Sequence, residues 1–393
     1  MITISLCMIV KNEEKTLERC LRSVDGIPDE IVIVDTGSED STKAIAGRFT
    51  SRVFDFEWID DFSAARNYAF EQAAMDYILW LDADDVLLPE DRTKLLELKN
   101  TLNPTVDAVS MIYHYSFDES NNVSESNRRF RLVKASKHFV WVGLVHEDLV
   151  AADSEHTYFD SDIVVTHRKP ADGPSSCQRN LLMFEKHLTA GRKLNPVDLF
   201  HYARELEVNG EFEKAIPYFL QFLEWKGSES DTYRDLSLFA LHKLARCYFM
   251  TGNLDKEWEC ALKSLELDVP RPEFSCRFGE RFLNGNHFRQ AIFWYELALQ
   301  DPAGKTTRDW GVQHYPFKTW LPHKQLGLCY YRVGDYKRSL HHNKLARKYL
   351  PDDPDIETNI RLLERLANES TDKVQAKEEP LPGGFAPDPR GGS

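Results

Sequence analysis

Short apolar runs alternate with helical stretches along the first 85 residues, and this alternation restricts the fold more than any other feature. In the first helical stretch, Leu17, Cys20, Leu21 and Val24 fall on one stripe. Strands that alternate with helices predict a mainly parallel sheet with helices on both faces. The expected strands are residues 2–10, 30–35, 52–58 and 77–85, and the expected helices are residues 12–24, 38–49 and 61–74.

The pattern changes after residue 100. Four apolar runs follow without helices of full length between them. They indicate a mixed edge added to the parallel sheet. These expected strands are residues 108–117, 127–136, 139–150 and 162–168.

After about residue 178 the strand patterns stop and one helical element recurs. Ala215, Glu257, Ala291 and Ser339 occupy the same position in it, and 34 residues separate the second from the third. This is the length of a tetratricopeptide repeat. A small residue at this position lets two helices cross closely, so Glu257 marks the least regular repeat. Stacked helix pairs form a solenoid that often binds a chain or a partner subunit, although such helices could instead only buttress the first domain.

We therefore expect three parts. Residues 1–175 form an α/β domain with a mainly parallel, mixed sheet, and residues 176–368 form a helical repeat domain. Residues 369–393 are rich in Pro, Gly and charged residues without an apolar period, which is typical of a disordered tail.

Composition narrows the possible functions. The formal net charge is −14, which disfavours non-specific binding to nucleic acid. Seven cysteines with irregular spacing and no CxxC motif favour reduced thiols and a cytoplasmic location over a disulfide framework or a zinc site. No apolar run approaches the roughly 20 residues that a membrane span requires, so we expect a soluble protein.

Acidic residues end the fourth expected strand. If the strand continues through Asp82 and Asp84, their side chains share one face and lie about 6.5 Å apart at the backbone. Two carboxylates in a cleft repel each other unless a proton or a cation lies between them. Mg²⁺ or Mn²⁺ would satisfy this requirement, whereas a solvated turn is the alternative.

Two other polar residues lie where ligands bind in open α/β sheets, beyond the carboxyl ends of the strands. Asp35 ends the second strand and could accept hydrogen bonds from a nucleobase or a ribose. Arg66 lies early on the third helix and could reach a phosphate with two hydrogen bonds. Without further context, Asp35 is equally well a turn or cap residue and Arg66 a surface residue.

Four motifs together carry a resemblance to a known family. CMIVKNEEKTLERCLRSV, EIVIVDTGSEDST, DFSAARNYA and ILWLDADDVL, in this order, resemble the family 2 glycosyltransferases, which have the GT-A fold. The resemblance is strong over residues 2–90 and looser over 100–170. It implies a nucleotide-sugar donor, such as UDP-glucose, and Mn²⁺ or Mg²⁺ as cofactor.

The resemblance also assigns roles to residues. It places uridine near Val10, Asn12, Glu13 and Asp35, and Arg66 near the nucleotide. It assigns Asp82 and Asp84 to the ribose and to the metal-bound diphosphate.

The stretch NRRFRLVKASKHFVWVGLVHEDL resembles a subgroup that includes lipopolysaccharide core glucosyltransferases and the glycocin (sublancin) S-glycosyltransferases. Members of the latter group carry helical repeats and form dimers. Inverting transfer needs a base, for which we expect Glu147, with Asp148 in reserve. If the strand continues, Glu147 shares a face with Trp141, which could stack on a sugar ring or belong to the core.

Basic residues complete the expected site. Arg128, Arg129 and Arg131 could screen the diphosphate, although strand alternation sends Arg128 to the opposite face from the other two. His167 closes the last strand and could complete the metal site, because some GT-A enzymes use a late His. His146 could orient Glu147 or be structural.

We therefore expect an inverting, metal-dependent enzyme that moves a hexose from a UDP-sugar to a peptide, protein or glycan, and whose helical repeats could form a homodimer. One alternative is an inactive scaffold of the same fold. A remote alternative is a nucleotidyltransferase, although KNEEKTLE lacks the glycine-rich loop that such an enzyme normally carries.

Overall fold

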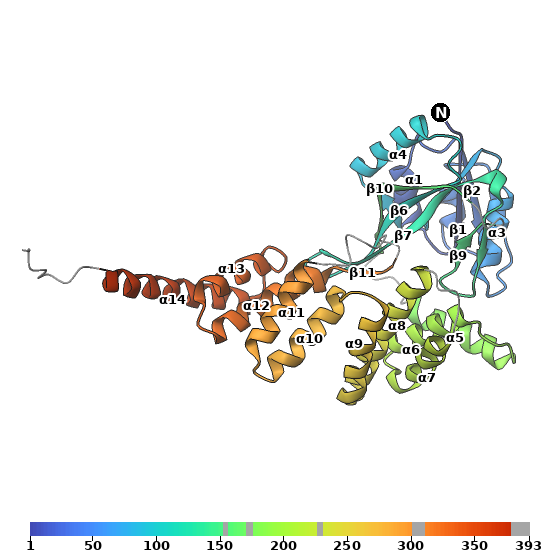
Figure 1. Ribbon diagram of the computed structural model, residues 1–393. Coiled ribbons are helices and arrows are strands. Elements are labelled where there is room, and N and C mark those ends of the chain that lie inside the picture. Colours follow the sequence, from blue (N-terminus) through green and yellow to red (C-terminus); the bar gives the residue numbers. More distant parts are fainter. Residues whose placement is uncertain (152–155, 170–175, 226–230, 301–310, 379–393) are drawn as a thin grey trace, which may run out of the picture. The chain divides into compact units, whose positions relative to one another are not determined.

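The computed structural model describes residues 1–151, 156–169, 176–225, 231–300 and 311–378. Its N-terminal part is built on a nine-stranded sheet with the order β3-β2-β1-β4-β7-β6-β10-β5, and β11 pairs with β7 (Figure 1). The strands are β1 (Ile4–Val10), β2 (Glu30–Asp35), β3 (Val53–Asp55), β4 (Tyr77–Trp80), β5 (Asp85–Leu87), β6 (Ala108–Phe117), β7 (Val123–Lys134), β10 (Tyr158–His167) and β11 (Gln313–His314). A separate hairpin pairs β8 (Val140–Val142) with β9 (Asp148–Val150).

Strands β1 to β4 are mutually parallel, as the alternation predicts. Strand β7 runs antiparallel to β4 and β6, and β10 runs parallel to β6. The sheet is therefore mixed, and the mixed part is the segment in which the sequence shows no full-length helices. The expected fold class, an α/β domain followed by helical repeats, is confirmed.

Helices cover both faces of the sheet. Helices α1 (Leu17–Ser23), α2 (Thr42–Ala46) and α4 (Pro89–Thr101) pack with alternate residues of β1 such as Leu6 and Met8. Helix α3 (Phe62–Glu71) packs on the opposite face with Cys7 and Ile78. Because successive residues of a strand point to opposite faces, β1 contributes to both cores and is almost fully buried.

Ten helices follow within the described residues, and consecutive helices pack against each other within each compact unit. Pro196, Pro272 and Pro354 each stand at or near a helix start, where the missing N–H costs nothing. The helices are α5 (Ser176–Thr189), α6 (Pro196–Val208), α7 (Phe212–Glu224), α8 (Asp231–Met250), α9 (Leu254–Leu267), α10 (Pro272–Asn284), α11 (Phe288–Gln300), α12 (Trp320–Arg332), α13 (Tyr336–Arg347) and α14 (Pro354–Glu378). Two 3₁₀ helices are η1 (Ala135–Lys137) and η3 (Tyr315–Lys318).

The repeat position found in the sequence is the fourth residue of helices α7, α9, α11 and α13. Ala215, Ala291 and Ser339 are fully buried there, as close helix crossings require. Glu257 is only half-buried, which agrees with its irregular place in the pattern. No described helix combines the length and the apolar character that crossing a membrane would demand.

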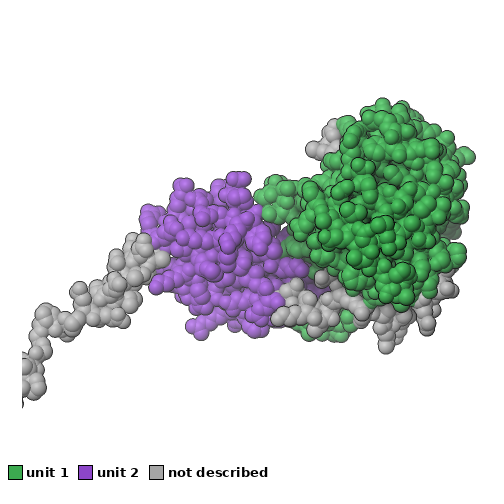
Figure 2. All heavy atoms as spheres, turned by 90° about the horizontal axis from the view of Figure 1, so that it is seen from above, with its two compact units in different colours: residues 1–270, 303–315 green, residues 271–302, 316–393 purple. Residues whose placement is uncertain are grey.

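The chain forms two compact units (Figure 2). The first contains residues 1–270 and 303–315, and the second contains residues 271–302 and 316–393. The first unit therefore combines the sheet with helices α5 to α9. It also contains β11, a short strand in a region where the sequence shows no strand pattern.

The C-terminal segment also departs from expectation. Helix α14 continues to Glu378, past residue 369, where we expected a disordered tail to begin. Ile356, Ile360 and Leu363 are buried at helical spacing. The helix continues past these residues to Glu378. The remaining tail, residues 379–393, lies outside the described residues.

Candidate active site

The loops after β1 and β2 are tied together at the carboxyl edge of the sheet. The Asn12 side chain accepts a hydrogen bond from Glu39 N at 2.8 Å, and Asn12 N donates to Ser38 Oγ at 2.9 Å. Asn12 adopts a φ of 55°, in the left-handed region that Asn tolerates. Thr36 N donates to the carbonyl of Val10 at 3.0 Å. Val10 and Asn12 are thus hydrogen-bonded to the loop that follows β2.

Asp35 lies beneath these loops and is 1% exposed. Its Oδ1 accepts hydrogen bonds from Gly37 N and Ser38 N at 3.0 and 2.9 Å. Its Oδ2 is buried and has no hydrogen-bond partner among the described residues. A buried polar atom without a partner is costly, so Oδ2 is an acceptor available for a ligand.

Glu13 joins the same edge. Its Oε2 accepts a hydrogen bond from Thr16 Oγ1 at 2.5 Å. Burial, together with the charges of Asp84 and Asp82, raises the pKa of Glu13. The electrostatic coupling places Glu13 near the acidic turn that follows β4.

The acidic residues after β4 do not continue the strand, which corrects our expectation. Strand β4 ends at Trp80, and the chain turns so that Asp82 N donates to Asp85 Oδ2 at 3.1 Å and Asp85 N to the Asp82 carbonyl at 3.0 Å. Asp82 and Asp84 therefore do not share a strand face. Asp82 pairs with Arg66, whereas Asp84 and Asp85 both approach His167.

Arg66 pairs with Asp82. Its Nη2 lies 2.7 Å from Asp82 Oδ1, and its Nε lies 2.5 Å from Glu147 Oε1. The guanidinium also lies over the rings of Trp80 and Trp141, 5.1 and 4.9 Å from their centroids. Arg66 thus connects helix α3, the acidic turn and the segment that holds Glu147.

These pairs set the charge state of the site. Burial alone would raise the pKa of Asp82, but the positive charges of Arg66 and Arg131 outweigh burial and hold this pKa well below its usual range. Burial likewise would lower the pKa of Arg66, whereas the charges of Asp82 and Glu147 raise it. The pair is therefore ionised at neutral pH.

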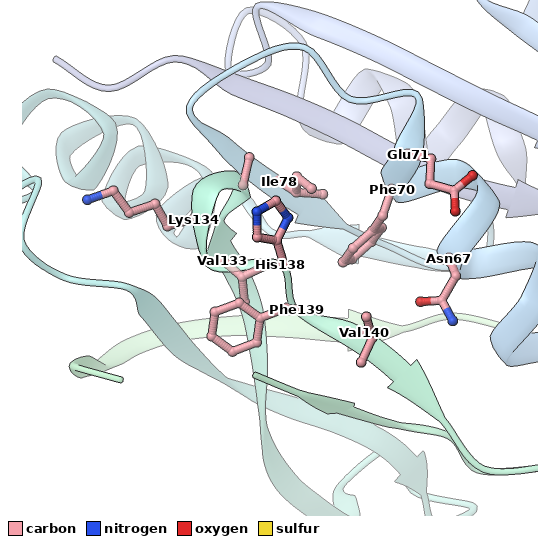
Figure 3. A pocket seen from close by; sticks show the side chains of 10 residues that line it. Asn67, Phe70, Glu71, Ile78, Val133, Lys134, His138, Phe139 and Val140 are labelled. Carbon is pink, nitrogen blue, oxygen red and sulfur yellow. The ribbon is translucent and has the colours of Figure 1, made fainter. Parts of the chain in front are cut away.

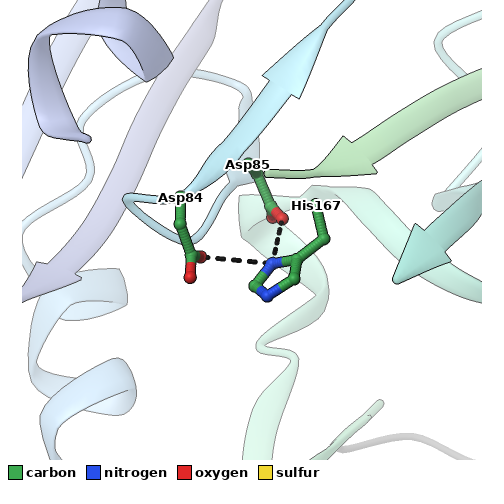
Figure 4. Close-up of side chains that lie close together, drawn as sticks. All are labelled: Asp84, Asp85 and His167. Atoms are coloured by element: carbon green, nitrogen blue, oxygen red, sulfur yellow. Dashed lines mark ion pairs between the residues drawn. The ribbon is translucent and has the colours of Figure 1, made fainter. Parts of the chain in front are cut away.

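Asp84, Asp85 and His167 form a cluster whose potential ligand atoms all lie within 4.8 Å of one another (Figure 4). His167 Nδ1 is 3.3 Å from Asp84 Oδ1 and 3.5 Å from Asp85 Oδ1. Burial would lower the pKa of His167, but its hydrogen bonds with Asp84 and Asp85 raise the pKa to about 10. The structure thus brings Asp84 and His167 together as expected, with Asp85 in the place we assigned to Asp82.

Asp85 is held by a second buried group. Arg131 Nη1 lies 2.9 Å from Asp85 Oδ2, and both side chains are 0% exposed. Arg131 lies over Trp80 and Tyr113, 3.8 and 4.3 Å from their ring centroids. The other oxygen of this carboxylate, Oδ1, is buried and faces His167 Nδ1 at 3.5 Å.

Glu147 lies in the turn of the β8–β9 hairpin and not on a continued strand, which corrects the expected face shared with Trp141. The hairpin pairs Trp141 with Leu149 and Val142 with Asp148. Gly143 opens the turn with a φ of 114°, and a Cβ there would lie 3.4 Å from the Glu147 Cα. Glu147 itself is 7% exposed.

Trp141 and Asp148 differ in their surroundings. Trp141 is 3% exposed and packs against Phe70 and Trp80, so its ring belongs to the core and does not face a free space for a sugar. Asn67 fixes its backbone, because the Asn67 amide donates to the Trp141 carbonyl and accepts from Trp141 N. Asp148 is exposed at the start of β9.

His146 does not orient Glu147. Its Nε2 lies 2.6 Å from Glu205 Oε1 of helix α6, and its ring centroid lies 5.0 Å from that of His201. Arg129, on β7, makes no ion pair with any described residue. It acts electrostatically on Asp148 and His146.

A separate hollow of about 370 Å³ lies beside α3 (Figure 3). None of the expected site residues lines it. Its lining residues are Asn67, Phe70, Glu71, Ile78, Val133, Lys134, Ala135, His138, Phe139 and Val140.

The sequence analysis did not assign Asp85 or Asn67 to the site, and it considered Arg131 only as a residue that could screen the diphosphate. The motif DADD contains Asp85, and its position beside Asp84 is the signal that could have suggested it. Arg131 reaches Asp85 because the β6–β7 register shifts between Val109 and Ser110, which simple alternation does not reveal.

Comparisons with known proteins find a family match in the part of the chain that carries the sheet. Residues 5–147 match the model of the family described as Glycosyl transferase family 2. The chain is 31% identical over 224 residues to the SPbeta prophage-derived glycosyltransferase SunS of Bacillus subtilis, covering 55% of this chain and 52% of SunS. It is 50% identical over 95 residues to a TPR repeat-containing protein of Synechococcus elongatus, covering 24% of each chain.

The chain spans at most about half the length of these curated relatives. Among solved structures it is similar to glucosyl-3-phosphoglycerate synthase from Mycobacterium tuberculosis in complex with Mn²⁺, UDP-glucose and phosphoglyceric acid. The TM-score is 0.25 with 23% identity, covering 28% of this chain and 44% of that chain. It is also similar to S. aureus TarS 1-349, with a TM-score of 0.32, 13% identity and coverage of 68% and 92%. Neither score supports a functional argument.

Proposed function

We propose that the protein is an inverting glycosyltransferase that moves a hexose from a UDP-sugar to an acceptor with the help of a divalent metal ion. The observation that carries the proposal is the Asp84–Asp85–His167 cluster, whose two carboxylates lie on the same acidic turn as Asp82, which Arg66 connects with Glu147. A candidate metal site and a candidate base are thus joined through one turn.

The donor nucleoside fits the edge formed by the β1 and β2 loops. Asp35 Oδ2 is a buried acceptor without a partner, and a uracil imide or a ribose hydroxyl would donate to it. Val10, Asn12 and Glu13 would border the same ligand. This assignment follows the family resemblance and extends it with the unpaired atom.

The metal ion fits the donor set of the cluster. Two carboxylates and an imidazole suit Mn²⁺, and Mg²⁺ is bound through fewer, all-oxygen protein ligands. Asp84 and His167 would hold the ion once His167 has given up its proton, and Asp85 Oδ1 offers a third atom. When bound, the ion would neutralise charge on the departing diphosphate.

Glu147 is our candidate base. It would accept the proton of the acceptor hydroxyl or thiol while that atom bonds to the anomeric carbon and the bond from this carbon to UDP breaks. Arg66 positions Glu147 but also competes for its carboxylate, so substrate binding must loosen this pair. Asp148 remains the reserve, because it is next in sequence and accessible.

Incubation with a panel of UDP- and GDP-sugars and Mn²⁺ tests the reaction. We expect slow hydrolysis of at least one UDP-sugar, since water can replace an acceptor. Absence of both binding and turnover for every nucleotide sugar would reject the proposal.

Asp84→Ala tests the metal site. We expect it to abolish Mn²⁺ binding measured by electron paramagnetic resonance, because it removes one ligand of the cluster. Asp25→Ala removes an exposed carboxylate and serves as the matched control. If Asp84→Ala binds Mn²⁺ as tightly as the wild type, the metal site does not include Asp84.

Glu147→Gln tests the base. We expect donor binding to persist while transfer falls by about 10²–10⁴-fold, the usual contribution of a general base. Glu97→Gln, on an exposed helix position, is the control. If Asp148→Asn instead has this effect, Asp148 is the base.

An inactive binding protein of the same fold is the second candidate. It is favoured by the Arg66–Glu147 contact, which occupies the candidate base. Such a protein would bind a UDP-sugar without hydrolysing or transferring it, so the donor panel separates the two.

The acceptor and the setting also belong to this proposal. A peptide, protein or glycan would dock beside the helical repeats, which could also hold two copies of the chain together. The free, buried cysteines of the described residues agree with a cytoplasmic location. Analytical ultracentrifugation would determine the oligomeric state.

A further inference from the structure

The motif DFSAARN (residues 61–67) contains more polar residues than the proposed function uses, because that function gives a role to Arg66 alone. Ser63, Arg66 and Asn67 are spaced i, i+3 and i+4, so they lie on one face of helix α3. All three bond to the β8–β9 hairpin, which lies 74 to 81 residues further along the chain. One helix face therefore grips one distant hairpin.

The hairpin needs such support, because it lies outside the nine-stranded sheet and forms a sheet of its own. An isolated two-stranded hairpin is marginally stable, so its position depends on what it packs against. Trp141 faces inward and is 3% exposed, whereas its neighbours Val140 and Val142 are 40% and 45% exposed. Trp141 packs against Phe70, one turn further along the same face of α3. Helix α3 is therefore a main support of the hairpin.

Asn67 binds the hairpin backbone in the way that a neighbouring strand would. Its amide nitrogen donates to the Trp141 carbonyl at 3.0 Å, and its oxygen accepts from Trp141 N at 2.8 Å. The side chain thus satisfies both polar groups that the edge of β8 presents at this residue. Because the bonds go to main-chain atoms, they fix the path of the strand.

Ser63 holds the start of the turn. This residue is 7% exposed, and its hydroxyl donates to the Gly143 carbonyl at 2.8 Å. Gly143 has a φ of 114°, which other residues rarely adopt, and a Cβ added there would lie 3.4 Å from the Glu147 Cα. Fixing the Gly143 carbonyl therefore fixes the turn that carries Glu147.

Arg66 makes a different kind of contact. Its Nε lies 2.5 Å from Oε1 of the Glu147 side chain, and its Nη2 lies 2.7 Å from Asp82 Oδ1. A guanidinium binds carboxylate and phosphate with the same donors, so a phosphate can replace a carboxylate in such a pair. The hydrogen bonds of Ser63 and Asn67 join neutral groups and offer a diphosphate no charge to displace. The helix face thus combines two fixed contacts with one exchangeable contact.

We propose that Ser63 and Asn67 are positioning residues that keep the β8–β9 turn against α3, so that Glu147 stays in place when the donor diphosphate draws Arg66 away from it. This inference rests on the proposed function, because it needs a donor and a base. Arg66 would couple the release of the base to donor binding, and its two neighbours would prevent the turn from moving with it.

Amide hydrogen exchange of the full chain tests the fixed contacts without any need for turnover. Asn67→Ala removes two hydrogen bonds, so we expect amides of residues 141–149 to exchange about tenfold faster or more. Ser63→Ala removes one hydrogen bond and should have a smaller effect in the same direction. Residues 5–10 of β1 are the internal control. Asn100→Ala is the matched variant, because the Asn100 amide bonds within its own helix, α4, and it should leave the hairpin unchanged.

Saturating UDP with Mn²⁺ tests which contact is exchangeable. In the wild type we expect the Trp141 amide to keep its protection when UDP is bound, because Asn67 still accepts its hydrogen bond. Loss of that protection would mean that the turn leaves α3 together with the Arg66 contact.

The rate of donor hydrolysis or transfer separates positioning from general stability. We expect Asn67→Ala to lower kcat about tenfold or more, because a small displacement of a base is costly, while the dissociation constant of the UDP-sugar changes by less than about twofold. A merely structural role would weaken donor binding together with kcat.

The inference fails if neither variant accelerates hairpin exchange, if UDP removes the protection of the Trp141 amide, or if kcat keeps its wild-type value while exchange accelerates. Unchanged exchange together with turnover of a UDP-sugar would reject the positioning role and leave the proposed function intact. Faster exchange in the variants without turnover of any donor by the wild type would reject the proposed function, and with it the catalytic purpose of these contacts.

Discussion

Single residues hold this site together through charge. Arg66 joins Asp82 to Glu147, and Arg131 holds Asp85 from inside the sheet. Buried ion pairs contribute little net stability over apolar packing, but they are costly to break on one side. Their value here is positional, because each guanidinium fixes a carboxylate that a substrate or metal would use.

Arg131→Met tests this cost. It removes the closer of the two cationic partners of the buried Asp85 and leaves only His167 at 3.5 Å, so we expect the free energy of unfolding to fall by about 3–5 kcal/mol in urea titrations at pH 7. Arg22→Met breaks an exposed pair with Glu18 and should have a much smaller effect. Adding Asp85→Asn should restore part of the loss, and no recovery would show that Arg131 acts mainly by packing.

At the scale of elements, the sequence predicted most of the architecture. The period of the apolar residues identified the four parallel strands, their helices and the repeated helix pairs, because burial on one or two faces imposes that period. The exact end of β4 was not predictable. Asp82 and Asp85 close a turn through reciprocal hydrogen bonds, and alternation alone cannot distinguish this turn from a longer strand.

The candidate site was predicted in part for a related reason. Asp35, Asp84 and His167 lie at strand ends, where a parallel sheet collects its ligands, so their neighbourhood follows from topology. Which side chains pair with each other depends on contacts between segments that are far apart in the sequence. Nothing local indicates that Arg66 would bridge Asp82 and Glu147, or that His146 would turn toward α6 instead of Glu147.

Helices α12 and α13 carry an element-scale response to pH. His323 Nδ1 and His342 Nδ1 are 3.0 Å apart. Burial lowers the pKa of each to about 4, with charges on neighbouring histidines contributing. The unfolded chain takes up protons below about pH 6.5, whereas the folded pair stays neutral until about pH 4, so stability falls as the pH decreases through this window.

His342→Gln should make the free energy of unfolding of the second unit less dependent on pH between about 6.5 and 4. Urea titrations at several pH values, followed by circular dichroism, measure this slope. His341→Gln changes an exposed neighbour and should keep most of the slope. An identical slope in wild type and His342→Gln would contradict the assignment.

At the scale of the whole molecule, the first unit is discontinuous. Strand β11 pairs with Ser126 and Glu125 of β7, on the part of β7 beyond the residues that β4 pairs. Burial would raise the pKa of Glu125, but its hydrogen bond with His314 outweighs this and lowers the pKa to about 2. The charge state of Glu125 in the sheet thus depends on His314, which follows helices α10 and α11 in the sequence.

His314→Ala should loosen the N-terminal half of β7. We expect amide hydrogen exchange of residues 123–127 to accelerate about tenfold or more, because a charge-assisted hydrogen bond and strand contacts are weakened. Residues 132–134 pair with β4 and provide the internal control. Equal protection of residues 123–127 in both proteins would mean that β11 contributes no stability to the sheet.

The late return of β11 also has a consequence for synthesis on the ribosome. Domains generally fold as units while the chain emerges N-terminus first. Here the sheet cannot gain its last strand until residues 313–314 have left the exit tunnel, after helices α10 and α11 have already been made. A nascent chain paused before that point would expose the open edge of β7, a surface on which chaperones or other chains could act.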